Sequence, residues 1–193
     1  MSSFLHISAL RTDKIDSTWT IFLDRDGVIN KRIVDGYVKS PDEFEFLPGA
    51  LEAIRIISRK TPRVIIVTNQ QGVAKGLMSS QEVDRVHDFL RKQVMETGGR
   101  IDGIYFCPEW AHQASNCRKP NSSMAVRAKQ DFPEIDFSKS IMVGDMPSDI
   151  EFGKRLGMTT VWLQGDGQTK YSGDIKPDYF ACSLWAVGDV LKR

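Results

Sequence analysis

The sequence lacks the features that would assign it to a membrane, a disulfide scaffold or a nucleic-acid partner. No apolar run approaches the roughly 18 residues that a helix needs to cross a bilayer. The first 17 residues are too broken by polar side chains for a secretory signal. Three cysteines in 193 residues are an odd number, which favours a reducing compartment, and hence the cytoplasm, over a disulfide framework. A formal net charge of +1 and the absence of a basic groove argue against nucleic acid.

What remains is the composition of an ordinary globular protein. Apolar residues make up 41% and charged residues 26% of a chain that is long enough for one domain with a proper core. We expect a single domain over 1–193, with a leader at 1–18, a core at about 19–165 and a last strand and helix within 166–193. No helical segment carries an apolar stripe beyond what a sheet would cover, so we expect a monomer.

Short β-rich runs alternate with segments of helical periodicity along the whole chain. Strands are predicted at 20–23, 63–69, 101–107, 140–145 and 159–164, with a short edge strand at 177–183. Helices are predicted at 49–60, 79–99, 123–132, 148–157 and 183–192. This alternation predicts a three-layer α/β/α sandwich, a Rossmann-like fold with a mainly parallel sheet. In such folds the chemistry gathers at the carboxyl ends of the strands.

Polar residues stand at those strand ends. The stretch IFLDRDGVIN places Asp24 and Asp26 directly after an apolar strand, and Asp145 and Asp149 follow another. Side chains two positions apart on an extended segment point to the same side, so the first two carboxylates repel each other unless a cation lies between them. A cluster of carboxylates at one sheet edge favours Mg²⁺. The alternative is that Asp24 and Asp26 are turn and helix-cap residues.

Four motifs appear in order along the chain: DRDGV at 24–28, VTNQ at 67–70, CRKP at 117–120 and GDMPSD at 144–149. Together they resemble the motifs of the haloacid-dehalogenase (HAD)-like phosphohydrolases, over about residues 20 to 165. The strings GYV, FEFLPG and VTNQQGVAKG are similar to the branch that contains the D-glycero-D-manno-heptose 1,7-bisphosphate phosphatases and the histidinol-phosphate phosphatases.

The resemblance implies roles for these residues. Asp24 is the expected nucleophile and Asp26 the general acid and base. Mg²⁺ is expected between the Asp24 side chain, the Asp26 carbonyl and Asp145, with Asp149 orienting the metal site or Lys119. Expected contacts to the phosphoryl group and the substrate come from the following residues: Thr68, Asn69, Gln70, Arg118, Lys119, Arg32, Asp35, Gly36 and Tyr37. A plain surface loop is the alternative for the last four.

The chain departs from its relatives in the loop CPEWAHQASNCRKP. Members of the branch often bind zinc there, but Glu109 and Ser115 replace two of the four expected ligands. We expect a metal-free loop with Cys107 and Cys117 as ordinary thiols; a Cys107, His112, Cys117 zinc site is the alternative. His6 and His87 have no evident partners and are interpreted as surface residues. The two sites at which the family inserts large cap domains hold only short segments, so we expect a capless core.

The resemblance implies a Mg²⁺-dependent phosphomonoesterase that acts on a small phosphorylated metabolite, foremost heptose 1,7-bisphosphate at its 7-phosphate. Histidinol phosphate and general sugar phosphates remain the alternative substrates. A non-catalytic phosphoester-binding module is a further alternative, although such a module has no need of both Asp24 and Asp26. A phosphomutase is disfavoured because it would need a cap to exclude water.

Overall fold

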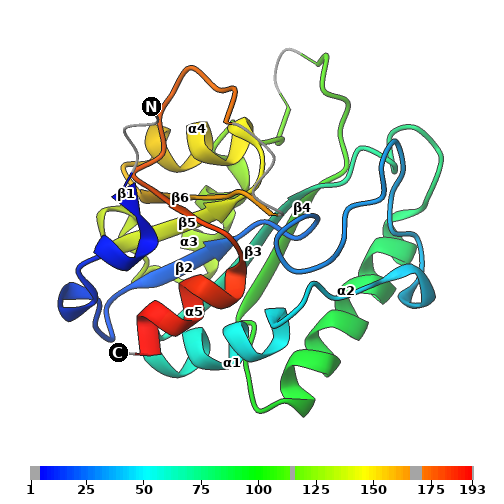
Figure 1. Cartoon of the computed structure of the whole chain (residues 1–193). Coiled ribbons are helices and arrows are strands. Elements are labelled where there is room, and N and C mark those ends of the chain that lie inside the picture. Colours follow the sequence, from blue (N-terminus) through cyan, green and yellow to red (C-terminus); the bar gives the residue numbers. More distant parts are fainter. Residues whose placement is uncertain (1–4, 114–115, 166–170, 193) are drawn as a thin grey trace.

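The structure, a computed structural model, describes residues 5–113, 116–165 and 171–192 (Figure 1). Within these residues, seven parallel strands form one sheet in the order β1-β7-β6-β5-β2-β3-β4. The strands are β1 Leu5–His6, β2 Thr20–Leu23, β3 Arg63–Asn69, β4 Gly103–Cys107, β5 Ser140–Gly144, β6 Thr159–Leu163 and β7 Tyr179–Ala181.

Helices cover both faces of the sheet (Figure 1). One face carries α1 (Ala50–Lys60), α2 (Ser80–Glu96) and α5 (Leu184–Lys192), and the other carries α3 (Ser123–Asp131) and α4 (Pro147–Arg155). Alternate residues of β2 serve the two layers, because successive strand side chains point to opposite faces. Ile21 and Leu23 pack in the core with α1 and α5, whereas Phe22 packs in the core with α3 and α4. The predicted three-layer α/β/α fold is confirmed.

The helix boundaries follow from local chemistry. Ser79 caps α2: its side chain accepts from the Glu82 N–H, and the Glu82 carboxylate accepts from the Ser79 N–H, so two otherwise unpaired donors are satisfied. At α4, Asp149 has the position that Glu82 has at α2: its carboxylate accepts from the backbone N–H of Met146 at 2.9 Å. This bond fixes the Asp149 side chain at the carboxyl edge of the sheet.

The two ends of the chain differ from the sequence expectation. Residues 5–18 join the domain: Leu5–His6 pairs with β7, and Ile7 and Ile15 are buried in the core. Consequently β7 lies inside the sheet, between β1 and β6, and is not the predicted edge strand. Residues 1–4, 166–170 and 193, which belong to the expected leader and C-terminal segment, lie outside the described residues.

The central position of β2 builds the site. Leu23 is in register with Ile66 of β3 on one side and Val143 of β5 on the other, so the residues that follow β2 lie between the last residues of β3 and of β5. The connection from β2 to α1 contains only a short 3₁₀ helix, η3 (Pro41–Glu43), and no cap domain stands between them. In the described part of the chain, no helix combines the length and apolarity needed to cross a bilayer.

Candidate active site

The chain turns sharply after β2. The Asp24 N–H still donates to the Val143 carbonyl of β5 at 3.0 Å, and the next residues fold back so that the N–H groups of Ile29 and Asn30 donate to the Arg25 carbonyl. Gly27 occupies this turn with φ of +93°. A side chain is disfavoured here by the backbone conformation, and a Cβ on Gly27 would lie 1.9 Å from Asp145 Oδ2. The turn therefore brings Asp24 and Asp145 together.

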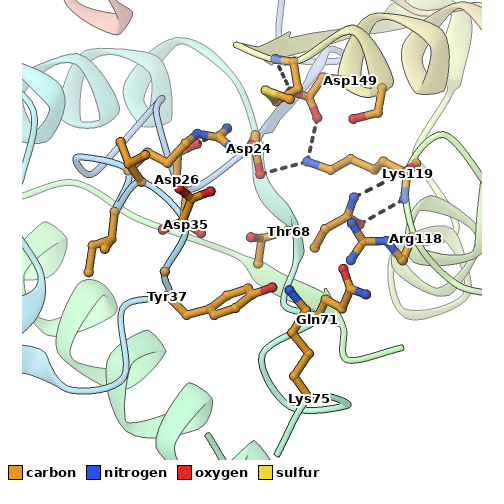
Figure 2. A pocket seen from close by; sticks show the side chains of 17 residues that line it. Asp24, Asp26, Asp35, Tyr37, Thr68, Gln71, Lys75, Arg118, Lys119 and Asp149 are labelled. Atoms are coloured by element: carbon orange, nitrogen blue, oxygen red, sulfur yellow. Dashed lines mark hydrogen bonds and ion pairs between the residues drawn. The ribbon is translucent and has the colours of Figure 1, made fainter. Parts of the chain in front are cut away.

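Lys119 connects the carboxylates at the strand ends. Its Nζ lies 2.8 Å from Asp24 Oδ1 and 2.7 Å from Asp149 Oδ1, and donates to the Val67 carbonyl at 2.7 Å (Figure 2). The lysine backbone is held as well, because its N–H donates to Asn69 Oδ1 at 3.0 Å. Both carboxylates and the ammonium are buried. The buried Lys119 ammonium is therefore placed to neutralise charge on an anion that approaches Asp24.

Burial and repulsion dominate the electrostatics of Asp24. Burial, together with the Asp149 and Asp145 carboxylates, raises its pKa to about 7 even though Lys119 opposes the shift. The pKa of Asp145 rises to about 6, mainly through burial, with Arg32 opposing. Burial alone would lower the pKa of Lys119, but Asp149 and Asp24 raise it, so the ammonium stays charged. The site holds more negative charge than its own cations balance, and a further cation would favour the ionised form of Asp24.

Asp26 has a different environment. Its Oδ1 accepts from Arg25 Nη2 at 3.0 Å and from Asn30 Nδ2 at 2.9 Å, and its Oδ2 accepts from Gln70 Nε2 at 2.8 Å. Burial would raise the pKa of Asp26, but Arg25, Asn30 and Gln70 together lower it. The pKa of Asp24 is thus raised and that of Asp26 lowered, although the two residues are only two positions apart. Opposite pKa shifts are typical of carboxyl pairs with different roles in acid–base chemistry.

His87 contradicts the sequence interpretation. It is buried, not a surface residue, and its Nε2 lies 3.1 Å from Nη1 of the fully buried Arg25. Burial, and secondly the Arg25 charge, lowers the pKa of His87 to about 3, so the ring is neutral and accepts from the guanidinium. His87 therefore supports Arg25, which in turn orients Asp26. His6 is exposed and contacts Ser8.

A cavity of about 620 Å³ opens above these groups. Most of the predicted site residues line it: Asp24, Asp26, Arg32, Asp35, Gly36, Tyr37, Thr68, Asn69, Arg118, Lys119 and Asp149. Asp145 is not among the lining residues, although its carboxylate lies within 4.8 Å of those of Asp24 and Asp149. Gln70 does not line the cavity either: it is fully buried, and its amide donates to Asp26 and to Thr68 Oγ1, so the prediction that it contacts substrate is replaced by a supporting role.

The cavity also includes residues that the sequence did not single out: Ile33, Val34, Gln71, Lys75, Met146 and Ser148. Lys75 lies 5.4 Å from the centre of the Tyr37 ring, and Figure 2 shows both with Gln71 on one side of the cavity. Gln71 and Lys75 belong to the string VTNQQGVAKG, which already pointed to the site. Their positions at the cavity depend on how the loop after β3 folds.

Three carboxylates at the strand ends could hold a metal ion. Carboxylate oxygens of Asp24, Asp145 and Asp149 lie within 4.8 Å of one another, which fits a hard divalent cation. The Asp26 carbonyl and the Asp145 carboxylate already share a positive group, because Nη2 of Arg32 donates to both. These residues fit Mg²⁺, whereas Asp149 is held by Lys119 and the α4 N-terminus.

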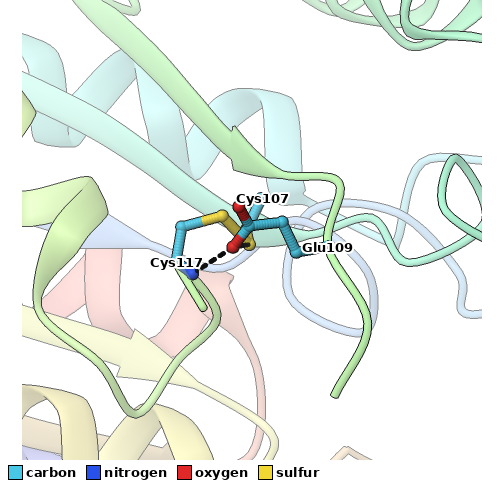
Figure 3. A group of neighbouring side chains, drawn as sticks. All are labelled: Cys107, Glu109 and Cys117. Atoms are coloured by element: carbon cyan, nitrogen blue, oxygen red, sulfur yellow. Dashed lines mark hydrogen bonds between the residues drawn. A yellow bond between two sulfur atoms is a disulfide. The ribbon is translucent and has the colours of Figure 1, made fainter. Parts of the chain in front are cut away.

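The expectation of free thiols in the loop after β4 is wrong. Cys107 and Cys117 form a disulfide, because the end of β4 and the CRKP segment bring their Cα atoms to 5.4 Å (Figure 3). Glu109 completes the cluster by accepting from the Cys117 N–H. His112 packs on Trp110, outside this cluster, and Ser115 lies outside the described residues. The alternative zinc set is thus not assembled.

Known proteins match this chain in sequence and in fold. A family model described as HAD-hydrolase-like matches residues 116–187. The D-glycero-alpha-D-manno-heptose-1,7-bisphosphate 7-phosphatase of Mycobacterium bovis is 42% identical over 138 residues, 72% of this chain and 73% of the relative. The D-glycero-beta-D-manno-heptose-1,7-bisphosphate 7-phosphatase of Haemophilus influenzae is 33% identical over 181 residues, 90% and 96% of the two chains.

A solved structure agrees. The D,D-heptose 1,7-bisphosphate phosphatase from B. bronchiseptica, solved with magnesium and phosphate, aligns with a TM-score of 0.80 at 32% identity, covering 89% of this chain and 96% of that chain. With the parallel sheet and the carboxylates at its edge, these relatives show that the chain belongs to the HAD-like hydrolase family. Within it, the chain falls in the branch of the heptose 1,7-bisphosphate phosphatases, and the family resemblance of the four motifs is confirmed.

Proposed function

We propose that this protein is a Mg²⁺-dependent phosphomonoesterase that removes the 7-phosphate of D-glycero-D-manno-heptose 1,7-bisphosphate through an aspartyl-phosphate. The observation that carries the proposal is the contact of buried Lys119 with Asp24 at the floor of the cavity, beside the carboxylates of Asp145 and Asp149. An arrangement of this kind supplies a nucleophile and the charge balance that an incoming phosphate dianion requires.

In the first half-reaction, a carboxylate oxygen of Asp24 attacks phosphorus and the bond to the sugar oxygen breaks. Lys119 offsets charge on the transferring group, and Thr68, whose hydroxyl lines the cavity, donates to a phosphoryl oxygen. The leaving alkoxide takes a proton from Asp26, which therefore has to enter this step protonated.

In the second half-reaction, Asp26 accepts a proton from water, and the resulting hydroxide attacks phosphorus and releases inorganic phosphate and the Asp24 carboxylate. The lowered pKa of Asp26 suits this base role. Asp26 leaves this step protonated, and the same proton serves the leaving alkoxide in the first half of the next turnover. The bound phosphate group raises the local negative charge and so favours the protonated carboxyl. Gln70 and Arg25 hold the Asp26 oxygens in place during both steps.

Asp24, Asp145 and the Asp26 carbonyl would hold Mg²⁺. When bound, the cation supplies charge neutralisation that lets an anionic nucleophile meet an anionic substrate. Asp149 supports this arrangement through Lys119 and is proposed to orient the lysine.

Cationic groups on the cavity wall support a substrate with a second phosphate. Arg118 is half-buried, and its Nη1 is a buried donor without a hydrogen-bond partner among the described residues. Burial lowers the pKa of Arg118, which marks a desolvated cation that gains from an anionic ligand. Lys75 lines the same cavity. Asp35, Gly36 and Tyr37 line it too and are proposed to contact the sugar. The cavity volume suits a small metabolite.

The proposal extends to the setting of the enzyme. The relatives are named for both anomers of the heptose bisphosphate, so the anomer is left to experiment. We place the protein in the cytoplasm as a monomer without nucleic-acid or membrane partners, and without structural zinc. The cysteine count no longer supports that location, because Cys107 and Cys117 form a disulfide.

The test is phosphate release from a substrate panel. The panel holds both heptose 1,7-bisphosphate anomers, histidinol phosphate and two hexose phosphates, each with MgCl₂ and with EDTA. We expect EDTA-sensitive turnover of one heptose anomer, abolished in Asp24→Asn and retained in Asp42→Asn, which changes an exposed aspartate. Preference for histidinol phosphate would keep the mechanism and reject the substrate. Tight binding of a phosphate ester without turnover would reject the enzyme.

A further inference from the structure

Arg32 holds three oxygen atoms at the edge of the cavity. Its Nη2 lies 2.8 Å from the Asp26 carbonyl, 2.8 Å from Asp145 Oδ1 and 2.9 Å from Asp145 Oδ2. Among the described residues, these are the polar contacts of its guanidinium. The arginine thus pairs with two of the three groups that, under the proposed function, would hold Mg²⁺.

A guanidinium nitrogen and a divalent cation cannot use these oxygens together. Mg²⁺ requires oxygen ligands at about 2.0–2.1 Å in near-octahedral order, whereas the Arg32 nitrogen keeps them at hydrogen-bond distance. Two positive groups so close would also repel each other strongly. One cation has to leave when the other arrives.

Arg32 is placed to leave. Its side chain is 40% exposed, whereas that of Lys119 is 2% exposed, so Arg32 is the cation of the site that can move without uncovering a fully buried side chain. It belongs to the 31–36 segment, which contains no helix or strand and includes Val34, 83% exposed. The same segment lines the cavity, on which Arg118 and Lys75 also lie. A displaced Arg32 therefore stays at the mouth of the cavity, within reach of an anion bound there.

We propose that Arg32 is an exchangeable counter-ion: it pairs with the Asp26 carbonyl and Asp145 until a divalent cation replaces it, and then contacts the non-transferred phosphate of the substrate. The inference rests on the proposed function for the identity of the anion. The replacement of Arg32 by a divalent cation does not depend on which substrate binds. Lys119 contacts Asp24 and Asp149, and Arg32 donates a hydrogen bond to neither of them, so the exchange leaves the contacts of Lys119 in place.

The first experiment is calorimetric titration of MgCl₂ into protein without substrate, at fixed ionic strength. Removal of the competing guanidinium in Arg32→Ala should tighten Mg²⁺ binding about fivefold, which corresponds to about 1 kcal/mol. Lys31→Ala is the matched control, since it removes the same charge from the neighbouring residue, which pairs with Glu45 instead. We expect its Mg²⁺ affinity to stay within about twofold of wild type. Unchanged or weaker binding in Arg32→Ala, or equal tightening in both variants, overturns the exchange.

The second experiment measures steady-state kinetics at saturating Mg²⁺. Arg32→Ala should raise KM for heptose 1,7-bisphosphate about tenfold, through loss of a charge-assisted contact, and leave KM for p-nitrophenyl phosphate unchanged because that ester has no second phosphate. An equal change for both esters overturns the phosphate contact. A wild-type chain that turns over no heptose bisphosphate contradicts the proposed function instead, and the calorimetric result still decides the exchange.

Discussion

Gly27→Ala tests whether one turn sets the geometry of the whole metal site. Gly27 has φ of +93°, where a non-glycine residue costs about 1–2 kcal/mol. An added Cβ would also lie 1.9 Å from Asp145 Oδ2, although real Cβ contacts essentially never fall under 3.0 Å. The Asp145 carboxylate therefore has to move by about 1 Å, which is enough to cost about 100-fold in rate when a catalytic arrangement is misplaced.

Gly157→Ala separates the clash from the backbone strain. Gly157 follows α4 with φ of +76°, and an added Cβ there meets nothing within 4 Å. Both variants should therefore lose about 1–2 kcal/mol of unfolding free energy, or about 2–8 °C in Tm for a chain of this length. Only Gly27→Ala should also weaken Mg²⁺ binding and lower kcat.

Thermal unfolding, MgCl₂ calorimetry and kcat on p-nitrophenyl phosphate measure these quantities on the same samples. The reasoning is refuted if Gly27→Ala loses stability like Gly157→Ala but binds Mg²⁺ and turns over ester like the wild type. That result would mean that Asp145 has another position from which it serves the site equally well.

Three further predictions concern stability. Ser79→Ala removes the cap of α2 and should lower the unfolding free energy by about 1 kcal/mol, or 2–4 °C in Tm, without a change in kcat. The pKa of His87 is about 3 in the fold against 6.5 unfolded, so the unfolded chain binds the proton first and stability falls as the pH drops below 6.5. Relative to His87→Gln, denaturant titrations should show the wild type losing about 1.5 kcal/mol between pH 6.5 and 5. Reduction of Cys107–Cys117, which closes a loop of sequence separation 10, should cost about 2–3 kcal/mol in thermal unfolding, with Cys107→Ser unaffected by the reductant.

The sequence predicted the fold well because local signals and the global arrangement agree here. The apolar β-branched run at 63–69 forms β3 with the predicted bounds, and the helix predicted from residue 79 begins there, with Ser79 as its cap. The edge of the sheet was predicted less well. Leu5–His6 is only two residues long and exposed, so it carries no periodicity, and its pairing with β7 depends on the whole domain.

The site divides in the same way. Asp24 and Asp145 could be placed together because each stands in a motif at a strand end, and Lys119 could be added because the CRKP motif resembles that of the family. The roles of Gln70 and His87 could not be predicted, because they depend on tertiary packing. Gln70 bonds to Asp26 only where the turn after β2 packs against the end of β3, and His87 meets Arg25 only through the buried face of α2. The disulfide depends on the 5.4 Å between two Cα atoms, ten residues apart, that only the folded loop brings together.

Charge balance explains why the two aspartates that open the site tolerate each other. Asp26 has its own partner in Arg25, so the unbalanced group is Asp24 with Asp145 and Asp149. When ionised, these three carboxylates face one ammonium and one guanidinium, which leaves one negative charge. Burial first, and secondly the neighbouring carboxylates, raise the pKa of Asp24. Replacement of the Arg32 guanidinium by a divalent cation would leave the group neutral. A phosphate dianion then meets no net repulsion at the nucleophile, while the displaced arginine becomes a partner for the second phosphate.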